Sequence, residues 1–155
     1  YGNGIYKTYL TEDADVLEFA MGAVASQARN AISKLRKSGL NIGLVSLKLF
    51  RPFPADDLRN FISRFETVIV FDRDIGYGYE GVLAYELKSA LYGLNNPPFI
   101  KGFIVGLGGR DVSDDHIIEG VEKGLDYAEN NQFSNKTEFI GLKLDELDFL
   151  KEGDD

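Results

Sequence analysis

The strongest constraint on the fold is an alternation of apolar runs with helical patterns, which repeats four times along the chain. Each run has the length of a buried strand, and each following stretch places apolar side chains at helical spacing. The runs lie at 14–20, 41–50, 67–72 and 99–105, and the helical patterns lie at 23–38, 54–65, 81–92 and 113–128. Parallel strands need crossover connections of this kind. The pattern therefore predicts one α/β domain, with a largely parallel sheet covered by helices on both faces.

Local signals at the helix ends support this prediction. Gly39 stands where a left-handed residue would end the first helix, and Pro54 suits the first position of the second. Ser113 is an N-cap residue for the last helix, because acidic residues follow it directly. Two further stretches, 6–10 and 137–144, alternate apolar and polar residues. We expect them to be edge strands or extended ends packed on the domain.

Composition excludes several classes of function. The chain has 155 residues and no cysteine, which excludes disulfides, a cysteine nucleophile and ligation of iron–sulfur clusters by its own side chains. Its net charge of −8 argues against a nucleic-acid partner, because phosphate groups repel an acidic surface. No apolar run approaches the roughly 18 residues of a membrane span. We expect a cytoplasmic protein without a membrane partner.

The sequence GYGYEG at 76–81 spells the G-x-G-x-x-G fingerprint of dinucleotide-binding turns. In such turns the first glycine directly follows the first strand, and an acid at the end of the next strand holds the ribose. Here three residues precede Gly76 after a third strand, and the next strand ends without a carboxylate. A second loop, GLGGRD, has Asp111 in place of a third glycine. We expect no binding of NAD or FAD. Glycine would then stand at positions 76 and 78 because the backbone needs a positive φ there. A Rossmann-like nucleotide-binding module is kept as an alternative.

The loops after the second, third and fourth strands carry the polar side chains that could serve a function. Loops at the carboxyl ends of parallel strands meet at one edge of the sheet, where ligands bind in α/β proteins. The binding or interface candidates are Arg51, Asp72, Arg73, Asp74, Tyr77, Gly108, Gly109, Arg110 and Asp111. Fixed ion pairs between the loops are the first interpretation, a surface for another protein or domain the second, and catalysis the third. No residue is assigned a catalytic or metal-binding role, and we expect His116 to be a surface residue.

Three stretches together carry a family resemblance. They read AMGAVASQARNAISKLRKSGLNIGLVSLKLFRPFP, VIVFDRDIGYGYEG and IVGLGGRDVSDDHI. They resemble the C-terminal region of the α subunit of pyruvate:ferredoxin oxidoreductase (pyruvate synthase). The resemblance covers roughly residues 5–128 and keeps the order and spacing of the loops. The resemblance is specific because FRPFP, DRDIGYG and GLGGRD occur together in one chain. The stretch DRDIGYGYEG resembles the pyruvate type more than the 2-oxoglutarate type.

The resemblance implies a core domain related to the C-terminal domain of transketolase. That fold is a three-layer α/β/α sandwich, whose mostly parallel open sheet has one antiparallel edge strand. The parent enzyme would decarboxylate pyruvate on thiamine diphosphate with Mg²⁺, pass electrons through iron–sulfur clusters to ferredoxin, and transfer the acetyl group to coenzyme A. This chain lacks the family's diphosphate-binding G-D-G motif and every cluster cysteine. It would therefore be a non-catalytic core domain that is inactive in isolation and binds none of these cofactors.

The same resemblance implies how the chain is divided. Residues 1–13 would be a linker or edge segment from a preceding domain, residues 14–130 the transketolase C-terminal-like domain, and residues 131–155 an acidic tail. The implied partners are the rest of the α subunit, a thiamine-binding partner subunit, an iron–sulfur subunit and, indirectly, ferredoxin. The remaining alternative is the C-terminal domain of another thiamine-dependent enzyme, such as a transketolase or another 2-oxoacid oxidoreductase.

Overall fold

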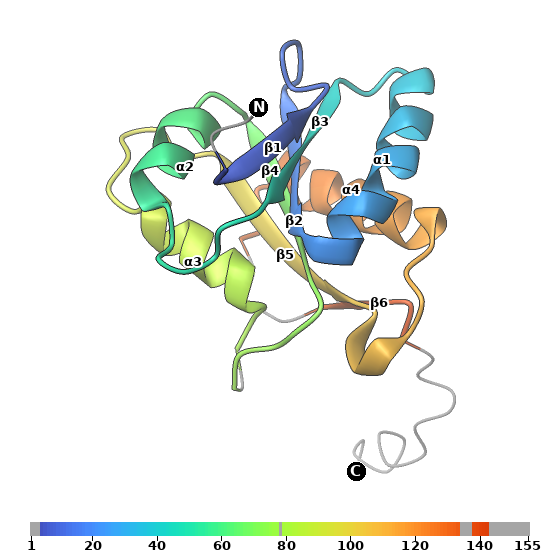
Figure 1. Ribbon diagram of the computed structural model, residues 1–155. Coiled ribbons are helices and arrows are strands. Elements are labelled where there is room, and N and C mark those ends of the chain that lie inside the picture. The colour runs from blue at the N-terminus through green and yellow to red at the C-terminus, as the bar shows by residue number, and fades with distance from the viewer. Residues whose placement is uncertain (1–3, 78, 134–137, 143–155) are drawn as a thin grey trace, which may run out of the picture.

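The computed structural model describes residues 4–77, 79–133 and 138–142 (Figure 1). In chain order the elements are β1 (Tyr6–Tyr9), β2 (Val16–Met21), α1 (Gly22–Lys37), β3 (Ile42–Leu47), α2 (Ala55–Ile62), β4 (Thr67–Asp72), α3 (Val82–Leu91), β5 (Phe99–Val105), the 3₁₀ turn η1 (Leu107–Gly109), α4 (Asp114–Glu129) and β6 (Phe139–Ile140). The strands form one sheet in the order β1-β3-β2-β4-β5-β6. β1 runs antiparallel to β3, and every other neighbouring pair is parallel.

This sheet confirms the predicted fold class. All four strand–helix units are present, with α1 and α4 covering one face of the sheet and α2 and α3 covering the other (Figure 1). Both alternating end stretches contribute edge strands. β1 is the antiparallel edge that the resemblance implies, and β6 is a parallel edge on the opposite side. β6 lies beyond residue 130, and the domain boundary at that residue stays a prediction.

The core consists of two apolar clusters, one on each face of the sheet. β3 and β4 are buried along their whole length, as expected for parallel strands covered on both faces. Side chains along β2 alternate between the clusters. Val16 and Ala20 join the cluster under α1 and α4, whereas Leu17 and Phe19 join the one under α2 and α3. This double coverage holds the strand ends in place, and with them the loops that follow.

The helix ends follow the predicted signals with two differences. Gly39 has a φ of 101° after α1, which confirms the left-handed residue. Pro54 is the N-cap of α2, one residue before its predicted position. Ser113 caps α4 by accepting a hydrogen bond from the N–H of His116, and His116 Nδ1 accepts one from the N–H of Ser113, both at 3.2 Å. His116, which we expected to be a surface residue, is half-buried, and its ring completes a capping box that the sequence did not indicate.

Glu18 lies on β2 in the middle of the sheet and is completely buried. It pairs with Leu44 on β3 and Ile69 on β4, both members of the cluster under α1 and α4. Among the residues that the structure describes, neither of its carboxyl oxygens has a hydrogen-bond partner. Burial disfavours the charged form and raises the pKa of Glu18 to about 8. The side chain is therefore neutral at pH 7.

We expect the wild-type chain to lose stability as the pH rises from about 4.5 to about 8, because folded Glu18 keeps a proton that the unfolded chain releases. Glu18→Leu abolishes this titration. The variant should therefore gain stability relative to the wild type with rising pH, by up to about 5 kcal/mol above pH 8. Denaturant unfolding of both proteins across this range measures the difference, and Glu18→Gln separates the lost titration from the added apolar packing. A difference that does not change with pH would contradict the expectation.

α3 has no side-chain cap at its own N-cap residue, which is Gly81. Asp72, the last residue of β4, caps the helix from the sheet instead. Its carboxylate accepts hydrogen bonds from the N–H groups of Leu83 and Ala84, both at 3.1 Å. A Cβ atom on Gly81 would lie 2.5 Å from the Cβ atom of Asp72 and closer still to Oδ2. Glycine is therefore what allows the start of α3 to approach the end of β4 closely enough to be capped.

Gly81→Ala should lower the free energy of unfolding by about 2–3 kcal/mol, because the added methyl group displaces the Asp72 carboxylate from both N–H groups. In a chain that already carries Asp72→Gly, the same substitution should cost less than about 0.5 kcal/mol, because Asp72→Gly removes both the capping carboxylate and the Cβ atom that the added methyl group would meet. Urea unfolding of the wild type, the two single variants and the double variant measures this coupling. Purely additive costs would show that the close approach is not the reason for the glycine.

Candidate functional site

β2 is the strand at which the chain reverses direction across the sheet. α1 leads from β2 to β3 on one side, and α2 leads back to β4 on the other. Open α/β sheets bind ligands outside the carboxyl ends of the two neighbouring strands between which the chain reverses direction. Here these strands are β2 and β4. The ends of β2 and β4 and the loop after β5 lie toward the lower edge of the sheet in Figure 1. We call the junction of β2 with α1, together with the loops after β4 and β5, the carboxyl edge and take it as the candidate site.

A cavity of about 260 Å³ lies between the ends of β2 and β4. The first turn of α1 and the end of β4 form its wall, and its lining residues are Met21, Gly22, Ala23, Val24, Phe71, Asp72, Arg73 and Asp74. Three predicted site residues, Asp72, Arg73 and Asp74, therefore meet in this cavity. Its volume is below the roughly 300–1,000 Å³ of typical small-molecule pockets, so it suits a side chain or a small group better than a whole cofactor.

Asp72 is 4% exposed and engaged in capping α3. Burial raises its pKa to about 7, the two N–H donors lower it, and the carboxylates of Asp74 and Glu80 raise it again. The cap also bears on the dinucleotide alternative. A pyrophosphate at the start of α3 would need the N–H groups of Leu83 and Ala84, which a carboxylate of the chain already occupies. The GYGYEG stretch therefore leads into a capped helix and not into a nucleotide-binding turn.

Arg73 joins the loop after β4 to the loop after β5. Its Nη2 donates hydrogen bonds to the carbonyl oxygens of Gly106, at 3.1 Å, and Arg110, at 3.0 Å. Ion pairs with carboxylates were the expected link between these loops. Among the described residues, however, neither Arg73 nor Arg110 forms a salt bridge. Backbone carbonyls, which no sequence pattern reveals, hold the two loops together.

The loop after β5 projects from the carboxyl edge through glycines in the left-handed region. Gly106, Gly108 and Gly109 have φ values of 60°, 70° and 83°. Gly108 and Gly109 have open space where a side chain would begin, so backbone conformation and not crowding favours glycine there. Arg110 and Asp111, which follow, are exposed. An exposed arginine on such a projection is suited to contact another surface, because its planar donors can bind a carboxylate at two points.

The loop after β4 forms a turn that presents Tyr77. The N–H of Gly76 donates to the carbonyl oxygen of Glu80 at 3.1 Å and closes the loop at its base. Glu80 is 4% exposed and pairs with Lys88 on α3 at 2.6 Å, a structural role that the sequence did not indicate. The side chain of Tyr77 is fully exposed. The expectation of positive φ is wrong for Gly76, and Gly78 lies outside the described residues.

Arg51 lies apart from these residues. Its Nη2 pairs with Glu86 on α3 at 2.6 Å, and its guanidinium carbon lies 4.0 Å from the centre of the Phe50 ring. It does not line the cavity between β2 and β4. The structure therefore brings Asp72, Arg73 and Asp74 together, joins the Arg110 backbone to them through Arg73, and separates Arg51 from this group.

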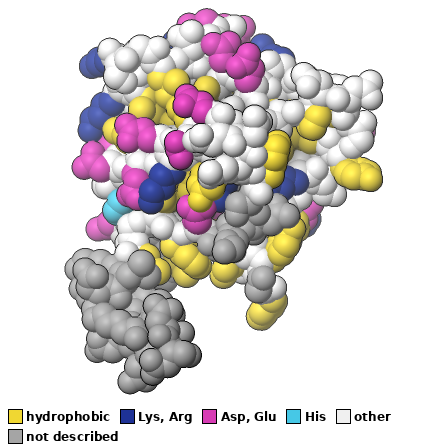
Figure 2. Space-filling view, turned by 180° about the vertical axis from the view of Figure 1, so that it is seen from behind, with side chains coloured by type: hydrophobic (Ala, Val, Ile, Leu, Met, Phe, Trp, Pro, Cys, Tyr) yellow, Lys and Arg dark blue, Asp and Glu magenta, His cyan; other side chains and the backbone are white. Residues whose placement is uncertain are grey.

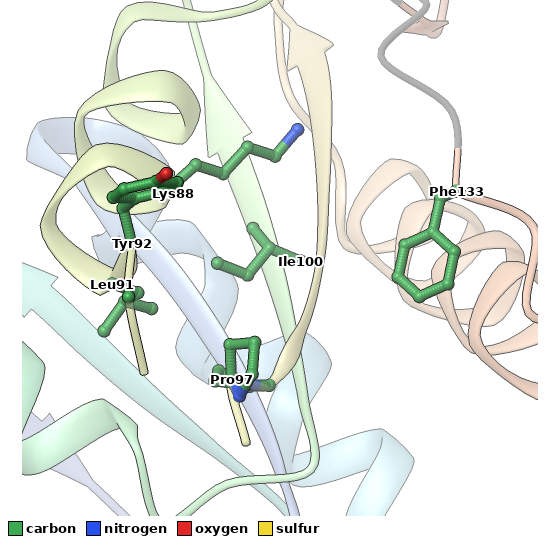
Figure 3. Close-up of a pocket in the computed structure, with 8 residues that line it drawn as sticks. Lys88, Leu91, Tyr92, Pro97, Ile100 and Phe133 are labelled. Carbon is green, nitrogen blue, oxygen red and sulfur yellow. The ribbon is translucent and has the colours of Figure 1, made fainter. Parts of the chain in front are cut away.

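A second pocket, of about 310 Å³, lies where α3 ends and β5 begins, away from the carboxyl edge (Figure 3). Its lining residues are Lys88, Leu91, Tyr92, Gly93, Pro97, Pro98, Ile100 and Phe133. In Figure 3, Leu91 at the end of α3 and Tyr92 after it lie across Ile100 from Phe133. Tyr92 and Phe133 are 86% and 79% exposed. No sequence pattern indicates this pocket, because its walls come from segments that only folding brings together.

The surface of the molecule is divided by side-chain type. Seen from behind, the molecule carries acidic side chains mainly on its α4 half, with hydrophobic patches toward the other half (Figure 2). Within the described part of the chain, no group of three or more His, Cys, Asp or Glu residues could hold a metal ion. The described helices also include none that is long and apolar enough to cross a membrane.

Comparison with known proteins gives a consistent result. A family model described as pyruvate:ferredoxin oxidoreductase core domain II matches residues 14–117. Similar curated proteins include the ketoisovalerate oxidoreductase subunit VorA of Pyrococcus abyssi, 34% identical, and the pyruvate synthase subunit PorA of Methanocaldococcus jannaschii, 35% identical. Each match covers 92% of this chain, but only 36% and 35% of the two relatives. The chain therefore spans about a third of their length.

Two solved structures have the same fold. One is a 2-oxoglutarate:ferredoxin oxidoreductase from Magnetococcus marinus with 2-oxoglutarate, coenzyme A and succinyl-CoA bound, with a TM-score of 0.61, 23% identity, and coverage of 81% of this chain and 20% of that one. The other is a split-gene transketolase in an inactive β4 tetramer, with a TM-score of 0.61, 18% identity, and coverage of 81% and 43%. These likenesses confirm the transketolase-like fold. With the family model matching more than half of its length, the chain belongs to the pyruvate:ferredoxin oxidoreductase core domain II family.

Proposed function

We propose that this chain is core domain II of a 2-oxoacid:ferredoxin oxidoreductase, and that it supports thiamine-dependent oxidative decarboxylation by the whole enzyme. The observation that carries the proposal is the family match over residues 14–117, which runs from β2 to the start of α4 and includes every loop of the carboxyl edge. The relatives are named as subunits of such oxidoreductases. In the whole enzyme the acyl group would pass to coenzyme A and the electrons to ferredoxin.

Pyruvate is the substrate that we propose within this class, because DRDIGYGYEG resembles the pyruvate type. Relatives named for ketoisovalerate are about as similar as those named for pyruvate, so ketoisovalerate is the competing substrate. The assembled enzyme should reduce ferredoxin with a kcat/KM at least about tenfold higher for pyruvate, a difference of about 1.4 kcal/mol in transition-state stabilisation. Steady-state assays with coenzyme A and each 2-oxoacid measure this ratio. An inverted ratio would reassign the substrate, and no activity with any 2-oxoacid would refute the proposed function.

The cofactors of this reaction would be held outside the chain. Iron–sulfur clusters need cysteine thiolates, which the sequence lacks. Mg²⁺, which would accompany thiamine diphosphate, prefers several oxygen ligands. The described residues include no cluster of three or more His, Cys, Asp or Glu side chains that could supply them. The cavity of about 260 Å³ is too small for a whole coenzyme A. We therefore place these cofactors in the rest of the subunit, a thiamine-binding partner and an iron–sulfur subunit of a cytoplasmic enzyme.

The contribution of this domain would be a rigid interface. Asp72 fixes the start of α3, and Arg73 fixes the loop after β5. On this support, Tyr77 and Arg110 face outward, and tyrosine and arginine are enriched where proteins bind one another. We propose that the carboxyl edge contacts a neighbouring domain or subunit of the oxidoreductase.

Arg110→Ala should change the stability of this chain by no more than about 0.5 kcal/mol, because its exposed side chain has no salt-bridge partner among the described residues. The same substitution should weaken assembly of the oxidoreductase by about 2–5 kcal/mol, since it would leave a carboxylate of the partner unpaired in an interface. Thermal unfolding of the chain and a subunit-association assay measure the two effects.

Lys123→Ala is the matched control, because Lys123 is also an exposed cation but lies on α4, away from the carboxyl edge. It should change neither assembly nor turnover. If Arg110→Ala lowers the melting temperature strongly and the assembled enzyme loses activity only in proportion to lost protein, the loop is internal support and the interface proposal is wrong.

A further inference from the structure

Lys101 on β5 is a charged residue in an apolar layer of the domain. Its side chain is only 1% exposed, and it lies on the same face of β5 as Phe103, a member of the cluster under α1 and α4. A buried ammonium group is costly unless a negative charge and further contacts replace the lost water. Residues that surround its Nζ atom must therefore compensate for the charge.

The compensating groups come from β5, from α4 and from the segment that leads into β6. Glu138 Oε1 lies 2.5 Å from Lys101 Nζ. The rings of Tyr127 and Phe103 lie 4.2 Å and 5.5 Å from the same nitrogen, within the range of cation–π attraction. A hydrogen bond to Glu138 raises the pKa of Tyr127, so the phenol keeps its proton and orients the carboxylate. Tyr127 therefore touches both members of the ion pair.

β6 depends on a small number of anchors because it has only two residues. The N–H of Ile104 donates to the carbonyl oxygen of Glu138 at 2.8 Å. Ile140 is 4% exposed and packs in the cluster under α1 and α4, whereas Phe139 is 36% exposed. Gly141 lies against the ring of His116, at the start of α4. Glu138 and Gly141 therefore contact the two ends of α4 on either side of the strand.

We propose that Lys101, Glu138 and Tyr127 form an electrostatic latch that makes the docking of β6 onto β5 nearly all-or-none. With β6 in place, the charge of Lys101 is paired and buried. If β6 leaves, Glu138 leaves with it, and the ammonium group must become hydrated at an open edge of β5. The latch therefore opposes partial detachment, which would expose an unpaired strand edge to other chains. Two of its three members, Tyr127 and Glu138, lie beyond the region that the family model matches, which ends at residue 117.

The test is amide hydrogen exchange in the full 155-residue chain. The N–H of Ile104 reports β6 detachment, because its acceptor is the carbonyl oxygen of Glu138. The N–H of Val70, on the interior strand β4, reports opening of the whole sheet. Glu138→Gln should accelerate exchange at Ile104 by at least about 100-fold, because it leaves the ammonium of Lys101 without a counter-charge. Exchange at Val70 should change by less than about threefold.

Two controls isolate the latch. Glu122→Gln removes a carboxylate from α4 beside Tyr127 without touching Lys101, and it should leave exchange at Ile104 unchanged. Lys101→Met removes the buried charge. Adding Glu138→Gln in that background should therefore accelerate exchange of the Ile104 N–H by less than about threefold. Equal acceleration at Ile104 and Val70, or loss of folding in Glu138→Gln, would mean that the pair stabilises the whole domain, and the latch would be refuted. An unchanged exchange rate at Ile104 in Glu138→Gln, or the same acceleration in the Lys101→Met background, would also refute it.

Discussion

The pairing of β2 with both β3 and β4 is the interaction on which the rest of the structure depends. It places β2 inside the sheet, so its alternating side chains tie together the two apolar clusters. It also creates the point at which the chain reverses direction, and the cavity at the carboxyl edge lies there. Because these strands are covered on both faces, the loops at their ends start from rigid positions. The candidate interface is a consequence of that rigidity.

Three buried ionisable residues show three different ways to avoid an uncompensated charge. Asp72 uses its carboxylate to cap α3, and Lys101 pairs with Glu138 beneath β6. Glu18 has no partner among the described residues and stays protonated at neutral pH, because burial raises its pKa to about 8. The first two join segments that are distant in the sequence. Glu18 and Asp72 both weaken the fold as the pH rises, because each carboxyl group keeps its proton to a higher pH in the folded chain than in the unfolded chain.

The division of labour in the proposed oxidoreductase follows from what this domain contains. The chain has no cysteine, and its described residues include no group of three or more side chains that could hold a metal ion. Its carboxyl edge instead combines a small cavity with an outward-facing tyrosine and arginine on braced loops. A domain of this kind would serve a larger enzyme by holding an interaction surface in a fixed position, which is the role that we propose for this chain.

The sequence alone determined the order of strands and helices, because strand and helix periodicity are local properties that a dozen residues express. It also placed the loops after β4 and β5 at one edge of the sheet, since the central strands run in parallel. It wrongly grouped Arg51, after β3, with them and did not indicate the start of α1. Only the tertiary structure decided what the individual side chains do there. Asp72 caps a helix that begins ten residues later, Arg73 bonds to backbone carbonyls of another loop, and Lys101 pairs across 37 residues with Glu138. These contacts depend on which segments folding brings within hydrogen-bond distance, and no local pattern carries that information.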